Sequence, residues 1–515
     1  MRLAQRRPGL LPGLALVALA CLSFLPAVWS SFVSDDLLLV HNLRHAHGLG
    51  WALSRNDAGE AGAAGHFYRP FWTLWNLGVF RLFGASAVAF HLGNLLLYAV
   101  IVLEVWALAS RVADPWRAWI AAAAFAVYPR HGESVAWVSG NTDLTAVAAG
   151  LGALLCATAR WPLAARVLGA AALTAVATLC KEIAFVLPAL AVLLLWRRGR
   201  RRSDLLIPAA MLAVEAGTFA ARWPELGGFG GYSGYPWTLP RVAGVAGSYA
   251  IAALTPPSVE TFRYPVVLVV PALVVALALW RVWRRPDRAL VVGLAWFTIS
   301  ILPLLNLAVD LNNANGERLM LLASVGLALA LAGLLPAGGW SVWMAGAVAG
   351  AVALGIGLSL YSSFDWIHAG RISTRVVRQA ERLAPENGEL ILLSAPENYR
   401  TAHVFTGGDL SEALSDRSPG FTTAICTQVV VREQRPGAVR FAPNGSAYRG
   451  TATWDAPFDF PALRPASSLT GDCSYSRPPG RRRIGLGLLV DAAPRPSRAP
   501  SALVYYDGRD IRRCC

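Results

Sequence analysis

Long apolar runs recur through the first two thirds of this chain, and they constrain its fold more than any other feature. About eleven of them approach or reach the length needed to cross roughly 30 Å of hydrocarbon as helices. With 55% apolar and only 15% charged residues, a soluble fold is excluded for a chain of this length. The chain is therefore predicted to be a polytopic α-helical membrane protein. The expected spans are 10–29, 88–109, 117–128, 143–159, 163–180, 183–196, 205–221, 264–283, 289–305, 319–336 and 341–361.

Arginines beside short loops predict the orientation. They collect before the first span, at 197–202 after the sixth and at 281–288 after the eighth, and such clusters mark the cytoplasmic side. The N-terminus is thus predicted to be cytoplasmic, in a bacterial cytoplasmic (inner) membrane, with the tail after the last span periplasmic or extracellular. Residues 240–256 are expected to form a re-entrant or interfacial helix. The basic, apolar start also resembles a secretory signal, but an uncleaved first span is the expectation.

The net charge of +15 comes almost wholly from arginine. The loop clusters are those that topology requires, and no nucleic-acid fold signature accompanies them. Membrane lipids, and not nucleic acid, are therefore the expected partners of these charges.

Two adjacent carboxylates, Asp35 and Asp36, follow the first span. They begin a loop of about 30–87 on the predicted external side, and a connection of this length is usually functional. Acidic residues beside a span are costly and indicate a site. Arg69 lies in the same loop, and polar residues of the other external junctions fall on the same side: His131, Glu133, Asn141, Asp143, Lys181, Glu182, Glu317 and Arg318.

Together these residues predict one external vestibule, in which carboxylates stand beside the cations Arg69, Lys181 and Arg318. Lys181 is the only lysine of the chain, which favours a compact point charge at that position, although a pairing with Glu182 at a helix end would also explain it. Such a vestibule suits a reaction that deprotonates an acceptor hydroxyl while a departing phosphate is neutralised. A donor reachable from the bilayer is expected to be linked to a lipid.

Histidines and cysteines add two weaker expectations. His41, His45, His47 and His66 accompany the acidic pair and leave a divalent metal open as an alternative, although their spacing matches no known metal site, so no metal ligand is assigned. In the tail, an oxidising compartment would allow disulfides. The preferred pair is Cys426 with Cys473.

Several short motifs resemble one family. Residues 32–36 (FVSDD), 68–70 (YRP), 90–98, 131–143, Lys181-Glu182 and 317–319 look like the membrane half of the TMTC-type O-mannosyltransferases and their bacterial relatives, within the GT-C superfamily of membrane glycosyltransferases. The resemblance covers about 10–335. It implies inverting transfer of a sugar from a polyprenyl-phosphate donor to a protein, glycan or lipid hydroxyl, with Asp35 as base. Asp36 would orient the acceptor or share that role. Arg69, Lys181 and Arg318 would meet the donor phosphate, and His131, Glu133, Asn141, Asp143, Glu182 and Glu317 would line the acceptor side.

The chain departs from the TMTC pattern after the last span, where no 34-residue helical repeat is found. A helix near 372–383 and strands at 390–394, 422–432, 447–454, 486–490 and 502–506 predict a small α+β domain. We therefore expect a membrane domain at 1–364 and an external domain at 365–515. A polysaccharide polymerase or ligase is the nearest alternative function, and a secondary transporter is a more distant one, because no two-fold repeat of hydropathy is visible.

Overall fold

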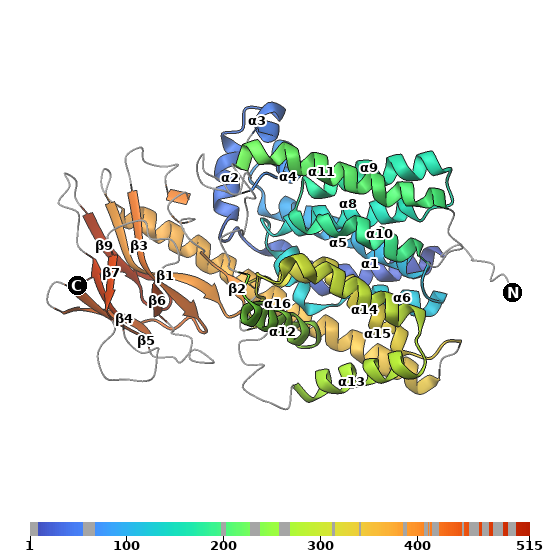
Figure 1. Ribbon diagram of the computed structural model, residues 1–515. Helices are drawn as coiled ribbons and strands as arrows, with labels where there is room; N and C mark the ends of the chain where they lie inside the picture. The colour runs from blue at the N-terminus through green and yellow to red at the C-terminus, as the bar shows by residue number, and fades with distance from the viewer. Residues whose placement is uncertain are drawn as a thin grey trace.

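The computed structural model is a bundle of helices with a C-terminal domain of two β-sheets at one end (Figure 1). The end of the bundle that faces this domain is called the domain-side end below. The structure describes residues 9–54, 67–196, 202–226, 237–256, 268–311, 315–338, 341–384, 389–405, 410, 413–414, 422–444, 447–452, 463–465, 473–476, 488–492 and 501–514.

Each of the predicted apolar runs contains a helix. Among the described residues, five helical segments are long and apolar enough to cross a membrane: Leu10–Trp29, Ala87–Ala109, Arg202–Leu226, Glu317–Leu334 and Val342–Leu383. Five shorter apolar helices accompany them, at Asn141–Ala157, Leu163–Thr178, Glu182–Leu195, Leu239–Leu254 and Arg288–Leu304. The prediction of a helical, multi-pass membrane protein is confirmed, and the number of about eleven spans stays a prediction.

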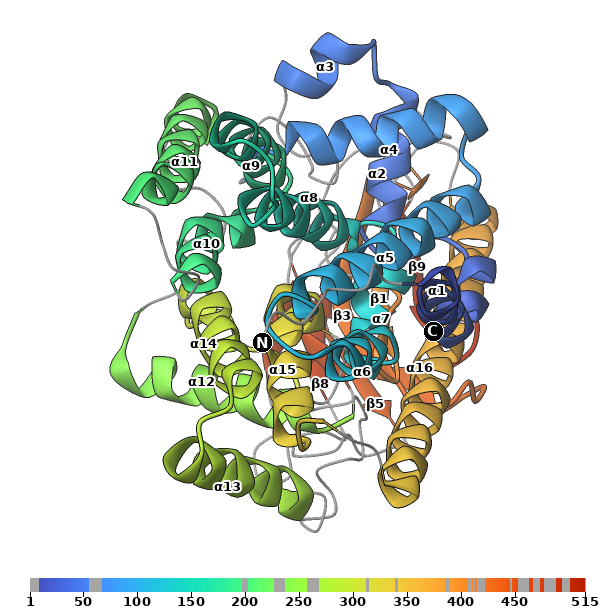
Figure 2. The ribbon, with the colours of Figure 1, turned by 90° about the vertical axis from the view of Figure 1, so that its right-hand side faces the viewer.

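The elements before the C-terminal sheets are, in chain order, α1 (Leu10–Phe24), η1 (Leu25–Trp29), α2 (Asp36–Arg44), α3 (Leu49–Ser54), α4 (Pro70–Phe83), α5 (Ala87–Ala109), α6 (Pro115–Ala126), η2 (Pro129–His131), α7 (Gly132–Ala136), α8 (Asn141–Ala157), α9 (Leu163–Thr178), η3 (Glu182–Val186), α10 (Leu187–Leu195), η4 (Arg202–Leu205), α11 (Leu206–Leu226), α12 (Leu239–Leu254), α13 (Val269–Arg284), α14 (Arg288–Ile301), η7 (Leu302–Leu304), η8 (Glu317–Met320), α15 (Leu321–Leu334) and α16 (Val342–Leu383). Figures 1 and 2 show α12 running across the bundle axis, which supports the expectation of an interfacial or re-entrant helix at 240–256.

Local chemistry explains several helix ends and the closest helix pair. Asp114 caps α6 by accepting the Arg117 amide at 3.3 Å, and Asp287 caps α14 in the same way from Ala289 at 2.9 Å, as N-cap carboxylates do. The helices α14 and α15 cross where Gly293 lies against the α15 backbone. A Cβ on this glycine would fall 2.4 Å from a backbone nitrogen of α15. Small residues thus permit close packing of two apolar helices, as is common inside membranes.

One helix connects the bundle with the C-terminal domain. α16 is continuous over 42 residues and therefore about 63 Å long. Its first part exposes large apolar side chains such as Trp343 and Leu354, whereas its last part packs against the sheet through Ile372 and Val376. The expected span at 341–361 and the expected helix at 372–383 are one element. The expected domain boundary at 364/365 lies inside it.

The C-terminal domain contains a six-stranded and a four-stranded sheet. In the first, the order is β10-β9-β1-β3-β6, with β2 on β1, and β1 runs parallel to both β3 and β9. β1 is buried along almost its whole length, as expected of a strand covered on both faces. The second sheet has the antiparallel order β4-β5-β8-β7. The strands are β1 (Glu389–Tyr399), β2 (Ala402–His403), β3 (Thr422–Val431), β4 (Val439–Asn444), β5 (Ala447–Ala452), β6 (Leu463–Pro465), β7 (Cys473–Ser476), β8 (Leu488–Ala492), β9 (Ser501–Tyr506) and β10 (Ile511–Arg513).

The expected α+β character of this domain is confirmed. All five expected strands are present, as β1, β3, β5, β8 and β9. The sequence did not predict β2, β4, β6, β7 and β10, which are mostly two to four residues long and too short for an alternating pattern to stand out.

Candidate active site

The two carboxylates of the acidic pair have different environments at the start of α2. Asp36 is fully buried and accepts hydrogen bonds from the Ser139 amide at 2.7 Å and the Val33 amide at 3.1 Å. Asp35 precedes the helix and is partly exposed. Asp36 therefore fastens the loop after the first helix to the loop before α8, while Asp35 is the carboxylate that solvent can reach.

The pKa of Asp36 is raised to about 7, chiefly because burial disfavours the charged carboxylate. The hydrogen bonds from Ser139 and Val33 oppose this effect, and the charge of Asp35 adds a smaller increase. Repulsion within an adjacent acidic pair is thus a minor cause here, and burial is the main one.

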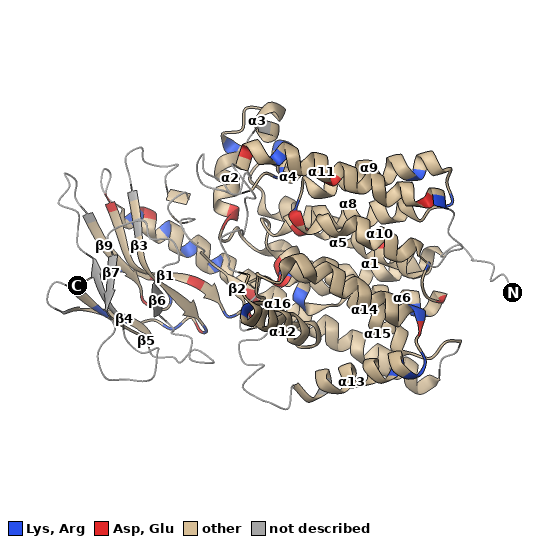
Figure 3. Ribbon diagram, in the orientation of Figure 1, with Lys and Arg blue, Asp and Glu red and all other residues tan. Residues whose placement is uncertain are grey.

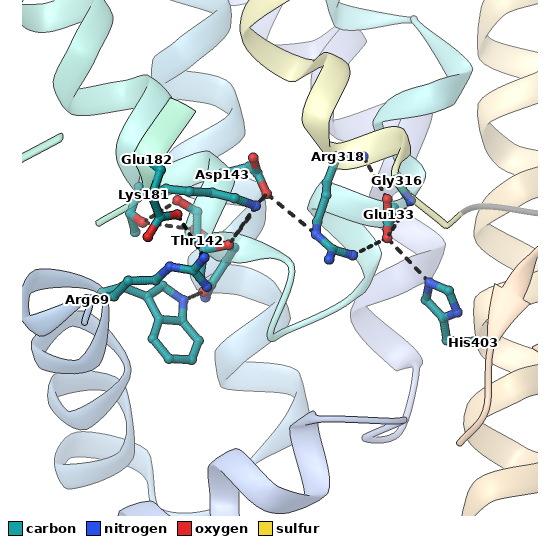
Figure 4. Close-up of polar contacts among 12 residues, drawn as sticks. Arg69, Glu133, Thr142, Asp143, Lys181, Glu182, Gly316, Arg318 and His403 are labelled. Atoms are coloured by element: carbon teal, nitrogen blue, oxygen red, sulfur yellow. Dashed lines mark hydrogen bonds and ion pairs between the residues drawn. The ribbon is translucent and has the colours of Figure 1, made fainter. Parts of the chain in front are cut away.

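A chain of ion pairs lies at the domain-side end of the bundle (Figure 4). Lys181 forms an ion pair with Asp143, and Nε of Arg318 lies 3.9 Å from the same carboxylate. Arg318 also pairs with Glu133. Segments that are remote in sequence therefore meet at Asp143. Its buried carboxylate needs cationic partners, and Lys181 and Arg318 supply them.

A second set of ion pairs involves Glu182, the residue that follows Lys181. Its carboxylate contacts Arg69 at 2.9 Å and also pairs with Arg222 from α11. Because Lys181 and Glu182 are adjacent, the two sets form one cluster, which we call the ion-pair cluster: Arg69, Arg222, Lys181, Arg318, Glu133, Asp143 and Glu182. It holds four cations against three carboxylates, a composition that favours an additional anion.

Glu133 is the best-satisfied carboxylate of the ion-pair cluster. Besides the Arg318 guanidinium, it accepts the Arg318 amide at 2.7 Å and the Gly316 amide at 3.4 Å. Burial raises its pKa, but the Arg318 charge and the hydrogen bonds outweigh this and lower the pKa to about 2. Glu133 is therefore ionised at neutral pH and acts as a fixed counter-charge for Arg318, not as a proton acceptor.

The C-terminal domain contributes a side chain that the sequence did not suggest. His403 of β2 is buried, and its Nε2 lies 3.3 Å from Oε1 of Glu133. Its ring also lies 5.2 Å from that of Trp137, whose own ring stacks under the Arg318 guanidinium at 4.8 Å. A backbone hydrogen bond of 2.8 Å from Ser34 to the Val404 carbonyl fixes the same hairpin beside the acidic pair.

Three residues expected in the vestibule lie outside the ion-pair cluster. His131 is buried between the Tyr98 and Ser324 hydroxyls, each at 2.8 Å. Glu317 pairs at 2.5 Å with Arg130, and both side chains are fully buried. Asn141 belongs to a buried amide network with Asn76, Asn94 and Trp72. These side chains stabilise the packing around the site, because each satisfies a buried polar group.

Two further expectations fall partly outside the described residues. The rings of His41 and His45 are 4.8 Å apart, whereas His66 is not described. Among the residues that the structure describes, no group of three histidine, cysteine or acidic side chains could hold a metal ion. Cys426 is disulfide-bonded, and so is Cys514, but the side chain of Cys473 lies outside the described residues, so its pairing with Cys426 stays a prediction.

The fold and the site thus define a multi-pass membrane protein with a buried ion-pair cluster beside a C-terminal α+β domain. No family model matches the chain. It is 33% identical to protein O-mannosyl-transferase TMTC1 of Mus musculus in an alignment of 160 positions that covers 28% of this chain, and 31% identical to TMTC1 of Homo sapiens in an alignment of 155 positions. The resemblance to TMTC-type proteins is therefore confirmed over that part of the chain. The matches span 17% and 18% of those relatives' lengths.

Two solved structures are similar at lower identity. ArnT from Cupriavidus metallidurans in the apo state is 16% identical, with 82% of this chain and 85% of that chain covered at a TM-score of 0.46. The arabinofuranosyltransferase AftD from Mycobacteria is 14% identical, with 93% and 40% covered at a TM-score of 0.43.

Proposed function

We propose that this protein is a membrane glycosyltransferase. It transfers a sugar from a polyprenyl-phosphate donor to a hydroxyl of a protein, glycan or lipid, on the outer face of the cytoplasmic membrane. The similarity to the TMTC1 O-mannosyl-transferases supports the reaction class. The observation that carries the proposal is the ion-pair cluster, whose cations exceed its carboxylates beside a partly exposed Asp35.

The reaction follows from these charges. The acceptor O–H bond breaks, and its proton passes to the Asp35 carboxylate. The acceptor oxygen bonds to the anomeric carbon as the bond from that carbon to the phosphate oxygen breaks, and the electron pair leaves with the lipid phosphate. Arg69, Lys181 and Arg318 stabilise the negative charge that develops there. One displacement inverts the configuration at the anomeric carbon.

The two acidic residues have separate roles in this proposal. Asp35 is the base, because it is the more accessible carboxylate. Asp36 holds the loop in place through its two backbone hydrogen bonds. The C-terminal domain completes the site through His403, which contacts the counter-charge of Arg318.

The test is transfer of label from a radiolabelled polyprenyl-phosphate sugar in membranes that contain the protein. We expect Asp35→Asn to lower the transfer rate at least about 100-fold, the usual contribution of a general base. Asp204→Asn is the matched control. Asp204 lies in η4, where it pairs with Arg166 of α9, away from the acidic pair. Transfer by Asp35→Asn at the wild-type rate would refute the proposal.

A further inference from the structure

The last part of α16 carries a row of arginines that the ion-pair cluster does not use. Arg371, Arg375, Arg378 and Arg382 are spaced four, three and four residues apart, so they share one face of the helix. They extend over about 16 Å of its length. Figure 3 shows basic positions recurring along α16 where it lies beside the sheet.

These arginines line a groove of about 390 Å³, together with Ser31, Thr374 and Gln379. The lining has four guanidinium groups and no carboxylate. Arg371, Arg378 and Arg382 are exposed. Within the described part of the chain, none of these three forms an ion pair with a carboxylate. The groove is therefore an open surface of concentrated positive charge.

Contacts behind the row hold the groove in shape. Arg375 donates to Gln434 at 2.9 Å, and Gln379 donates to Asp510 at 2.9 Å while accepting the Ile511 amide at 2.8 Å. The helix itself is buried on its other face against the sheet. The exposed guanidinium groups consequently stand on a rigid backbone, which lowers the entropy lost when they bind a ligand.

The position of the row relative to the lipid-facing part of α16 limits which ligands can contact all of its arginines. Phe364 is the last large apolar side chain exposed on this helix, at 51%. Arg371 follows about 10 Å further along, and Arg382 about 27 Å further along. A flat layer of headgroups would meet only the first arginine, so the row suits a ligand that extends away from the membrane.

We propose that this groove binds several phosphate groups carried in a row by one extended ligand. A phosphate group offers three oxygens and a charge of about −1.5 to −2, against two oxygens and a single charge for a carboxylate, so it can engage more of the neighbouring guanidinium forks. The proposal concerns binding alone and does not depend on the transferase activity. Since Ser31 precedes Asp35 by four residues, such a ligand would begin next to the loop that carries the acidic pair.

The experiment measures tripolyphosphate binding by calorimetry to the full chain in nanodiscs of neutral phosphatidylcholine. We expect the wild type to bind and the double variant Arg378→Gln/Arg382→Gln to bind at least tenfold more weakly. The variant Arg378→Lys/Arg382→Lys, which keeps the charge but not the fork, should fall between them. Arg435→Gln/Arg440→Gln is the control, since both arginines are exposed on the same domain outside the groove.

A second measurement distinguishes the source of the phosphate. Nanodiscs that contain phosphatidylglycerol should weaken tripolyphosphate binding if headgroups reach the same groove, and should leave it unchanged if the natural ligand is a soluble phosphate-bearing chain. Unchanged binding supports the proposal, whereas weaker binding would contradict the extended ligand, because a flat layer of headgroups should meet only Arg371. Absence of tripolyphosphate binding by the wild type, or equal affinity in the Gln double variant, overturns it. Failure of sugar transfer alone would contradict only the proposed function.

Discussion

Glu133 is predicted to stabilise the folded protein substantially. Its side chain is fully buried against Arg318, and its pKa of about 2 compares with an ordinary value of 4.5. That difference corresponds to about 3 kcal/mol at neutral pH. Because the pKa is lower in the folded state, this stabilisation is present above about pH 4.5 and is lost as the pH falls towards 2. Glu133→Gln removes it at every pH and leaves Arg318 without its main counter-charge.

The measurement is a double-mutant cycle in detergent, with tryptophan fluorescence as the probe of thermal unfolding. For a chain of this size, 3 kcal/mol corresponds to about 3 °C in the melting temperature. Glu133→Gln and Arg318→Gln should each lower it by about that amount, and the double variant by little more than either. Arg512→Gln, which breaks the exposed pair with Asp507, is the control and should shift it by less than 1 °C. Additive effects of the two single variants would refute the reasoning.

Three further predictions follow from buried groups. Gly293→Ala should lower the melting temperature by about 1 to 3 °C, because its Cβ would overlap the α15 backbone, whereas Gly217→Ala, with nothing within 4 Å, should not. Burial raises the pKa of Asp36 to about 7, so its contribution to stability is present below about pH 4 and is lost as the pH rises through 7. Asp36→Asn should reduce the change of melting temperature with pH between pH 5 and 8. An unchanged slope would contradict this prediction. His403→Ala should speed amide exchange around Glu133, measured by mass spectrometry, and equal exchange would show that the hairpin contact is unimportant.

Much of the membrane domain was predictable because its signal is local. The length of an apolar run is enough to predict a helix, and every predicted run contains one. The residues Arg69, Lys181 and Arg318 also come together, because charges at one end of several helices must find partners where water is scarce. The sequence could not show which carboxylate each cation would choose.

The remaining features depend on contacts between distant segments. His403 lies 270 residues from Glu133, and a lone histidine in a predicted sheet domain gives no sign of that contact. Arg222 offered a weak signal, as a charged residue near the end of an apolar helix. The position of His131 in a polar junction suggested a site, and the fold buries this side chain among aromatic rings and a serine hydroxyl.

Because α16 is continuous, its backbone fixes the orientation of the C-terminal domain relative to the bundle. A helix turns by about 100° and advances 1.5 Å per residue, so one residue inserted after Phe364 would rotate the whole domain about the bundle. The hairpin that carries His403 would then leave the acidic loop. The number of residues in this helix between the membrane and the sheet therefore sets both the distance and the rotation between the bundle and the domain. It determines whether the two halves of the site meet.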